Sequence, residues 1–194
     1  MKFDELNQLK RFFSLMNVEN KDERVSLALE LDEAFLYIFM LIDTENRLKK
    51  EKKEEDYYES LMIRLGDIFD EDDLSYEDEY LHDMAVDIID TTFRHLQEPY
   101  YLSQERALLI AQNEANTIYN HKDYIDAITE GKRYKTWYAE MDDKTRLAHA
   151  LVDSMRIPIN EMFPVGNDFM RYPHDWQNGS KENIINCRCT CVYE

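Results

Sequence analysis

Glycine and proline are scarce in this chain, with only 4 of each among 194 residues. Because tight turns depend on these two residue types, their scarcity argues against a fold of many short strands and favours long helices. Three of the glycines, Gly131, Gly166 and Gly179, fall in the last third of the chain. We therefore expect a predominantly α-helical N-terminal region and a small α+β C-terminal domain in which the turns are concentrated.

The chain also lacks a long apolar run. The longest such run covers residues 34–42, whereas a membrane-spanning helix needs about 20 residues. No secretory signal is visible, because charged side chains begin at Lys2 and Asp4. Cysteine is limited to an odd number, 3, which favours a reducing compartment over a disulfide framework. We therefore expect a cytoplasmic protein with no membrane segment.

Basic residues are also scarce relative to acidic ones. The chain has 23 Lys and Arg against 41 Asp and Glu, which gives a formal net charge of −18. Nucleic-acid binding depends largely on basic side chains that neutralise phosphates, so there is no strong case for a nucleic-acid partner. The acidity fits a basic protein partner or simple solubility. The most acidic segment, residues 70–79, is interpreted as a solvated turn and helix start, with a face for a basic partner as the alternative.

Apolar side chains recur at helical spacing through the first 130 residues. The spacing predicts four helices before Pro99, over residues 6–16, 22–42, 61–69 and 80–93. A further helix is expected to begin after Ser103, a suitable N-cap, and to end at Gly131. We place a boundary near Pro99, so that residues 1–99 form a helical region and residues 100–194 a second domain.

The segment after Gly131 has a different residue pattern. Residues 132–140 alternate in part and are aromatic, which indicates a strand. Residues 141–144 are expected to cap a short helix that runs through Leu151. Pro158 favours an extended segment around it, and short strand pieces are predicted at residues 184–185 and 190–193.

Residues with distinctive chemistry follow one another in this C-terminal region. They include an aromatic anchor, charged helix residues, a Tyr-Pro turn and an Asn-Cys-Arg-Cys sequence near the end of the chain. In order, they are Glu114, Trp137, Asp143, Arg146, His149, Tyr172, Pro173, Asn186, Cys187, Arg188 and Cys189.

This order and spacing resembles the C-terminal domain of the phage Mu F-like minor head (head morphogenesis) protein family. The resemblance covers roughly residues 106–191 and assigns the segment 100–194 to that domain. It implies a non-enzymatic phage or prophage protein that contacts a portal or capsid protein during head assembly or DNA delivery. The implied location is the bacterial host cytoplasm or the virion. One departure is Ser154, which stands where the family often has Gly, so either Ser154 adopts a strained left-handed backbone or the turn differs.

Metal binding is one interpretation of the histidines and cysteines. His149, His174, Cys187 and Cys189 are candidate zinc ligands. An extended Cys-x-Cys segment would separate the two side chains by about 7 Å, so a turn would be required. The competing interpretation, which we favour, is architectural. The cysteines are then buried small hydrophobic residues, and Arg188, pointing the opposite way, pairs with Glu114 or Asp143.

Catalysis is the lesser alternative. A Cys-His pair is able to act as nucleophile and base, but the sequence does not choose between Asp175 and Asp143 as the third member, and common catalytic motifs are lacking. We therefore expect no enzymatic activity and no cofactor. Zinc is the one exception that remains to be tested. Two other functions stay open: a small acidic phage-derived regulator or inhibitor of a host or phage protein, and a zinc- or cysteine-dependent enzyme.

Overall fold

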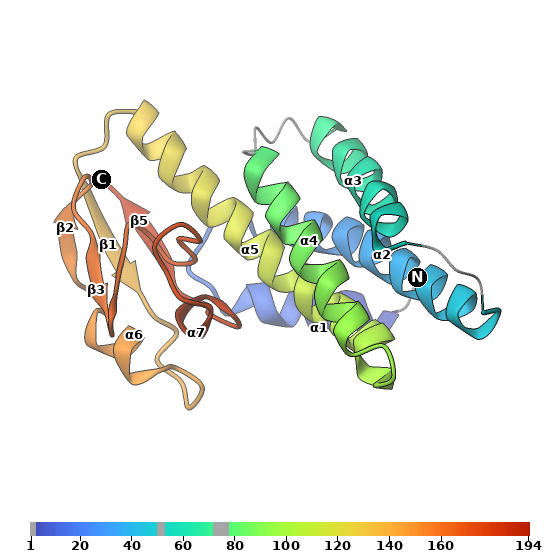
Figure 1. Cartoon of the computed structure of the whole chain (residues 1–194). Coiled ribbons are helices and arrows are strands. Elements are labelled where there is room, and N and C mark those ends of the chain that lie inside the picture. Colours follow the sequence, from blue (N-terminus) through green and yellow to red (C-terminus); the bar gives the residue numbers. More distant parts are fainter. Residues whose placement is uncertain (1–2, 50–52, 72–77) are drawn as a thin grey trace. The chain divides into compact units, whose positions relative to one another are not determined.

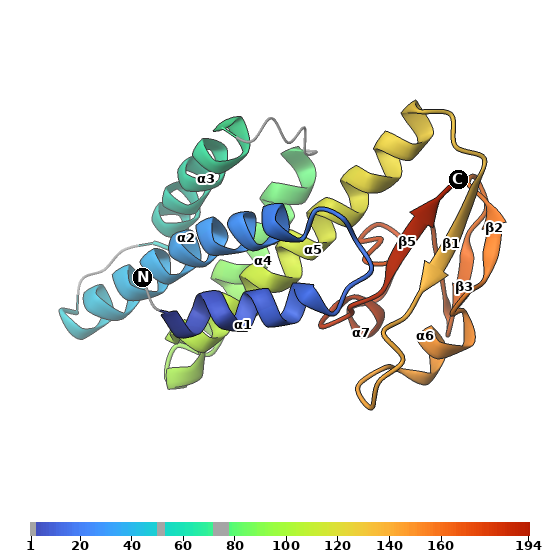
Figure 2. The same cartoon turned by 180° about the vertical axis from the view of Figure 1, so that it is seen from behind.

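The structure, a computed structural model, describes residues 3–49, 53–71 and 78–194 (Figures 1 and 2). Residues 72–77 of the acidic segment lie outside the described part of the chain. The long helices come first and the strands follow. The helical elements up to residue 129 are α1 (Phe3–Ser14), α2 (Lys21–Arg47), α3 (Glu54–Glu71), α4 (Asp78–Arg94), the 3-10 helix η1 (Pro99–Leu102) and α5 (Gln104–Thr129). The predicted fold class is confirmed.

The contacts within the chain define two compact units that do not follow chain order. Unit 1 comprises Met1–Val25 and Asn113–Glu194, and unit 2 comprises Ser26–Gln112. Helices α2 and α5 therefore contribute residues to both units.

Unit 2 is helical, and its core is built from the apolar positions that the spacing singled out. Phe35, Ile38 and Ile42 of α2 are buried, as are Leu61 and Leu65 of α3. Burial of such a stripe, rather than helix propensity, is what stabilises helices of this length in a protein.

The start of α5 lies in this unit and has the predicted cap. Ser103 Oγ accepts a hydrogen bond from the backbone N–H of Arg106 at 3.2 Å. The buried guanidinium of Arg106 donates to Thr92 Oγ1 and to Tyr101 O, both at 2.7 Å. Burial lowers the pKa of Arg106, and its carbon Cζ lies 4.8 Å from the centroid of the Phe39 ring. The cap and the buried cation together define where α5 begins.

Unit 1 contains the strands. β1 (Tyr134–Tyr138) is the central strand of an antiparallel sheet with the order β2-β1-β5, and Figure 2 shows β1 beside β5. β2 is Arg156–Pro158 and β5 is Thr190–Tyr193, while β3 (Phe163–Val165) and β4 (Asp168–Met170) form a hairpin. Two short helices lie between these strands in the chain, α6 (Leu147–Leu151) and α7 (Lys181–Ile184).

The core of this sheet region gathers around one aromatic side chain. Trp137 of β1 is fully buried, and Cys187 and Cys189 pack in the same cluster. The remaining members are Val152, Phe163, Val165 and Met170. The two cysteines are therefore core residues as well as candidate ligands.

Gly131 ends α5 as expected. Its φ of +75° is left-handed, and Lys132 N–H donates to Ala127 O at 2.9 Å while Gly131 N–H donates to Ile128 O at 3.0 Å. This pair of bonds is the Schellman arrangement, which satisfies carbonyls at the end of a helix. The strand expected after it is confirmed as β1.

Two local predictions were wrong. Helix α6 begins at Leu147, later than residues 141–144 suggested, because Asp142 Oδ1 accepts the Lys144 N–H at 3.0 Å and closes a turn of its own. Ile184 belongs to helix α7 and not to a strand. The Ile185 N–H donates to Lys181 O at 3.1 Å, which is a helical hydrogen bond. Two β-branched residues are too few to favour a strand over this local structure.

Ser154 adopts the left-handed backbone considered for this position. Its φ is +59°, and its N–H donates to Trp137 O at 2.8 Å, which fixes the turn that leads into β2. A left-handed conformation costs a residue with a Cβ atom about 1 kcal/mol. The turn is thus retained without glycine.

Lys135 is an unusual member of the unit 1 core. Its side chain is fully buried, and Nζ donates to Ile159 O at 2.8 Å. Nζ also lies 5.0 Å from the Tyr124 ring centroid and 5.4 Å from that of Phe163. Burial lowers the pKa of Lys135 to about 8, and the nearby groups Cys191, Asp175, Arg171 and Glu161 change it less.

We expect Lys135→Met to stabilise the protein near neutral pH by about 1–2 kcal/mol, because it removes a buried charge and keeps a similar volume. The folded-state pKa of about 8 lies below the ordinary value of 10.5, so the wild type gains stability as pH rises through this interval. The advantage of the variant should therefore shrink at about pH 10. Urea denaturation of both proteins at the two pH values measures this. An advantage that stays constant with pH would contradict it.

Candidate functional site

Helix α5 carries a row of asparagines on one face. Asparagine is unfavourable in helix interiors because its amide competes for backbone hydrogen bonds, so several on one face indicate a role for the side chains. The spacing of three and four residues places them one above another. They are Asn113, Asn116 and Asn120, and all three are buried.

These asparagines hold the backbone of the Asn-Cys-Arg-Cys segment. Asn113 Oδ1 accepts the backbone N–H of Asn186 at 2.6 Å. Asn116 Nδ2 donates to Cys187 O at 3.1 Å. Asn120 Nδ2 donates to the carbonyl of Cys189 at 3.4 Å. Three successive anchor points thus position residues 186–189 along the helix.

Arg24 fixes the direction in which two of the amides point. Its guanidinium is fully buried and donates to the Oδ1 atoms of Asn116 and Asn120, the latter at 3.2 Å. An ion pair of 2.7 Å joins it to Asp123. Burial lowers the pKa of Arg24 and raises that of Asp123. With their oxygens facing the cation, the two amides present their N–H groups to the C-terminal segment.

A turn brings the two cysteines together. Asn186 has a left-handed φ of +59°, and Cys187 N–H donates to Ile184 O at 3.0 Å. Strand β5 begins only at Thr190, so Cys187 and Cys189 do not have the extended geometry that would hold their sulfurs about 7 Å apart. The turn that the metal interpretation required is therefore present.

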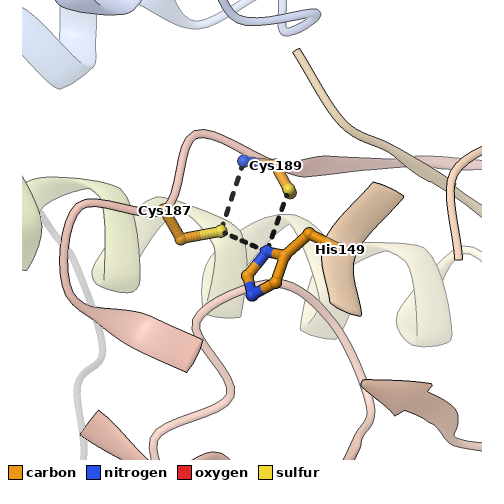
Figure 3. Close-up of side chains that lie close together, drawn as sticks. All are labelled: His149, Cys187 and Cys189. Atoms are coloured by element: carbon orange, nitrogen blue, oxygen red, sulfur yellow. Dashed lines mark hydrogen bonds between the residues drawn. The ribbon is translucent and has the colours of Figure 1, made fainter. Parts of the chain in front are cut away.

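His149, Cys187 and Cys189 point toward one another in the core of unit 1 (Figure 3). The Nδ1 atom of His149 lies 3.3 Å from Cys189 Sγ and 3.4 Å from Cys187 Sγ. The backbone N–H of Cys189 donates to Cys187 Sγ at 3.4 Å. All three side chains are buried, and their potential ligand atoms lie within 4.8 Å of one another.

Asn183 orients the imidazole ring. Its Nδ2 donates to Val165 O at 3.1 Å and to Asp168 Oδ2 at 2.8 Å, so its Oδ1 faces His149 Nε2 at 3.3 Å. Because an amide oxygen only accepts, Nε2 carries a proton. The indole of Trp137 packs edge-on against the ring, with centroids 5.8 Å apart. Nδ1 is thus the nitrogen that remains for the sulfurs, and in the neutral ring it presents a lone pair.

The pKa values of the two thiols are shifted in opposite directions. Burial opposes ionisation of Cys187, but its hydrogen bonds, the strongest with Cys189, outweigh this effect, so the pKa of Cys187 lies below its ordinary value. The pKa of Cys189 is raised, first by its hydrogen bond to Cys187 and then by burial. The two thiols interact strongly, so their titration belongs to the pair and not to either residue alone.

His174, the fourth candidate ligand, lies outside this cluster. Its Nε2 donates to Cys187 O at 2.8 Å, and its Nδ1 lies 3.0 Å from Thr117 Oγ1. Both ring nitrogens are therefore engaged with other groups. His174 supports the backbone of the cysteine segment together with Asn116, since one carbonyl is able to accept two donors.

The other residues singled out from the sequence make structural contacts or lie at the surface. Arg188 pairs with Asp142 at 2.7 Å rather than with Glu114 or Asp143, and this hydrogen bond holds the pKa of Asp142 below its ordinary range. Tyr172 Oη lies 2.7 Å from His121 Nδ1. Pro173 is buried and Asp143 exposed, while Arg146 Nη2 donates to Ile185 O at 2.5 Å.

Sequence reasoning missed the residues that hold the segment in place. The spacing of Asn113, Asn116 and Asn120 on one helix face was a signal that could have found them. Arg24 has no such signal, because its partner Asn116 lies 92 positions away. Asn183 likewise reaches His149 across 34 positions.

We expect Asn116→Ala to destabilise the protein by about 2–4 kcal/mol. The substitution removes one acceptor from the buried Arg24 and one donor from Cys187 O, and unsatisfied buried groups carry costs of this size. Urea denaturation gives the free energy of unfolding. The control is Asn160→Ala at an exposed site, with an expected change within about 0.5 kcal/mol. Equal effects of the two substitutions would contradict the role of Asn116.

One known protein family matches the part of the chain that contains these residues. A family model described as phage Mu protein F like protein matches residues 80–192. The match covers more than half of the 194 residues, and it contains α5, β1 and the whole histidine-cysteine cluster. No curated protein and no solved structure matches the chain.

Proposed function

This chain belongs to the phage Mu protein F-like family, and we propose that it is a phage or prophage minor head protein that acts in head morphogenesis. The observation that carries this proposal is the family match over residues 80–192. In the proposed role the protein contacts a portal or capsid protein during head assembly or DNA delivery. It works in the bacterial host cytoplasm and enters the virion.

The surroundings of the cysteines support a role without catalysis. Cys187 and Cys189 are buried, whereas reactive cysteines lie in partly exposed environments. A hollow of about 10 Å³ adjoins them, lined in part by Arg146 and Arg188. That volume admits about one water molecule, which leaves no room for an ordinary substrate beside either sulfur.

A groove in unit 1 supports contact with a basic protein segment. It has a volume of about 560 Å³ and lies among the α1–α2 connection, the end of α5 and strand β5. The carboxylates that line it are Glu19, Asp123, Asp126 and Glu130. With a net charge of −18 on the whole chain, such a surface attracts positively charged partners and increases the association rate.

The charge also favours a second candidate, an acidic regulator or inhibitor of a host or phage protein. Such a protein would act in the cytoplasm and would not be built into heads. The composition of purified heads therefore separates the two candidates.

Among the described residues, no helix combines the length and the apolar character that crossing a membrane requires.

We expect the protein to co-purify with heads or procapsids of the phage that encodes it, and deletion of its gene to reduce the yield of filled heads. Immunodetection in gradient-purified particles and electron microscopy of lysates measure these effects. Absence from particles, together with normal heads after deletion, would refute the minor head role and favour the regulator.

The groove is tested in the same system with charge reversals. Glu19→Lys combined with Glu130→Lys should weaken binding to the portal protein of the same phage at least about tenfold, because it repels a basic segment. The matched control reverses Glu33 and Glu59, which are exposed in α2 and α3, and changes the net charge equally. If both pairs weaken binding to the same degree, the groove is not the contact site.

A further inference from the structure

We propose that His149, Cys187 and Cys189 bind a zinc ion through Nδ1 and the two sulfurs. The proposal does not depend on the role in head assembly, because it rests on the geometry of unit 1 alone. In this account the ion ties α6, which carries His149, to the turn that precedes β5.

The two nitrogen-sulfur separations are close to those of a tetrahedral zinc site, and all three atoms lie within 4.8 Å of one another. Zinc-sulfur bonds of about 2.3 Å and zinc-nitrogen bonds of about 2.0–2.1 Å place nitrogen and sulfur about 3.6 Å apart. In the structure Nδ1 lies 3.3 Å from Cys189 Sγ and 3.4 Å from Cys187 Sγ. Outward movement of the sulfurs by a few tenths of an ångström would bring both nitrogen-sulfur separations to that value.

The choice of zinc follows from the ligand types. Two thiol sulfurs and one imidazole nitrogen are soft or intermediate donors, which zinc accepts readily. Calcium and magnesium prefer oxygen ligands, and the cluster offers none. Cys187 and Cys189 are free thiols in the structure, so both sulfurs remain available to an ion.

The groups behind the ligands are those that a metal site uses. Histidine ligands usually donate their second ring N–H to an oxygen acceptor, which fixes the ring and its tautomer. Asn183 Oδ1 fills this position at His149 Nε2, and its own amide is fixed by Val165 O and Asp168. The backbone N–H of Cys189 points at Cys187 Sγ and would stabilise a metal-bound thiolate there.

The backbone that carries the sulfurs is held in advance. Asn116 and Asn120 anchor the carbonyls of Cys187 and Cys189, so little ordering is left for the ion to impose. Solvent would supply the fourth ligand, because the hollow of about 10 Å³ beside the cluster has room for about one water molecule. His174 does not supply it, since its ring nitrogens face Cys187 O and Thr117.

The test uses the tag-free 194-residue chain purified under reducing conditions. Elemental analysis should find about one zinc per chain. After removal of the metal, titration with Co²⁺ should give the visible bands of tetrahedral cobalt and a near-ultraviolet sulfur-to-cobalt charge-transfer band. The wild-type spectrum decides the question without any variant. A folded wild type that shows no charge-transfer band would overturn the proposal.

The ligands are then assigned by substitution. Cys189→Ser and His149→Ala should each abolish tight metal binding, and circular dichroism shows whether they remain folded. The matched control is Cys191→Ser, because Cys191 belongs to the same segment but lies in β5 opposite Trp137 and outside the cluster. Retention of the charge-transfer band in this control is expected. Its loss there to the same degree would overturn the assignment.

Asn183 provides a graded test of the same site. Asn183→Ala leaves all three ligands in place and removes the acceptor of the His149 Nε2 proton. Loss of such a partner weakens metal affinity about 10–100-fold, and competition with a chelator of known affinity measures this. Unchanged affinity in the variant would contradict the role of Asn183 in holding His149 as a ligand.

Discussion

The hydrogen bonds from helix α5 to the backbone of residues 186–189 are the interaction on which the C-terminal part of unit 1 depends. Asn113, Asn116 and Asn120 each bind one backbone group of that segment. They are themselves directed in part by the buried cation of Arg24. Because buried amides and carbonyls are costly to leave unsatisfied, the segment has one favourable position. The left-handed turn at Asn186 and the meeting of the two sulfurs with His149 follow from it.

Most residues of the Mu F-like pattern form a framework around a small chemical centre. Trp137 fills the core of the sheet region, Tyr172 contacts His121, and Arg188 joins the segment to the loop before α6 through Asp142. The architectural interpretation of the pattern thus describes the framework, while His149 and the two cysteines keep the chemistry of a ligand set. A stable framework of this kind suits a protein that acts through contacts with other proteins. The acidic groove and the hollow beside the cluster have no lining residue in common.

The sequence allowed the helices and the central strand to be predicted, because these depend on local patterns. Apolar spacing located α2 to α4, Ser103 and Gly131 marked the ends of α5, and alternation marked β1. The contacts of the site were not predictable to the same degree. The partner of Arg188, the placement of His174 and the role of Arg24 depend on segments that are distant in the chain. Propensity likewise misplaced residues 184–185, where the turn into the cysteine segment overrides it.

Asn183 holds a proton on Nε2 of His149, so that Nδ1 faces the sulfurs. Long-range nitrogen–proton correlation NMR of the histidine rings measures this directly. We expect Nε2 of His149 to be protonated, whether Nδ1 is bare or bound to a metal. A neutral ring with its proton on Nδ1 would contradict the account, because the nitrogen that faces Cys187 and Cys189 would then be unable to act as a ligand.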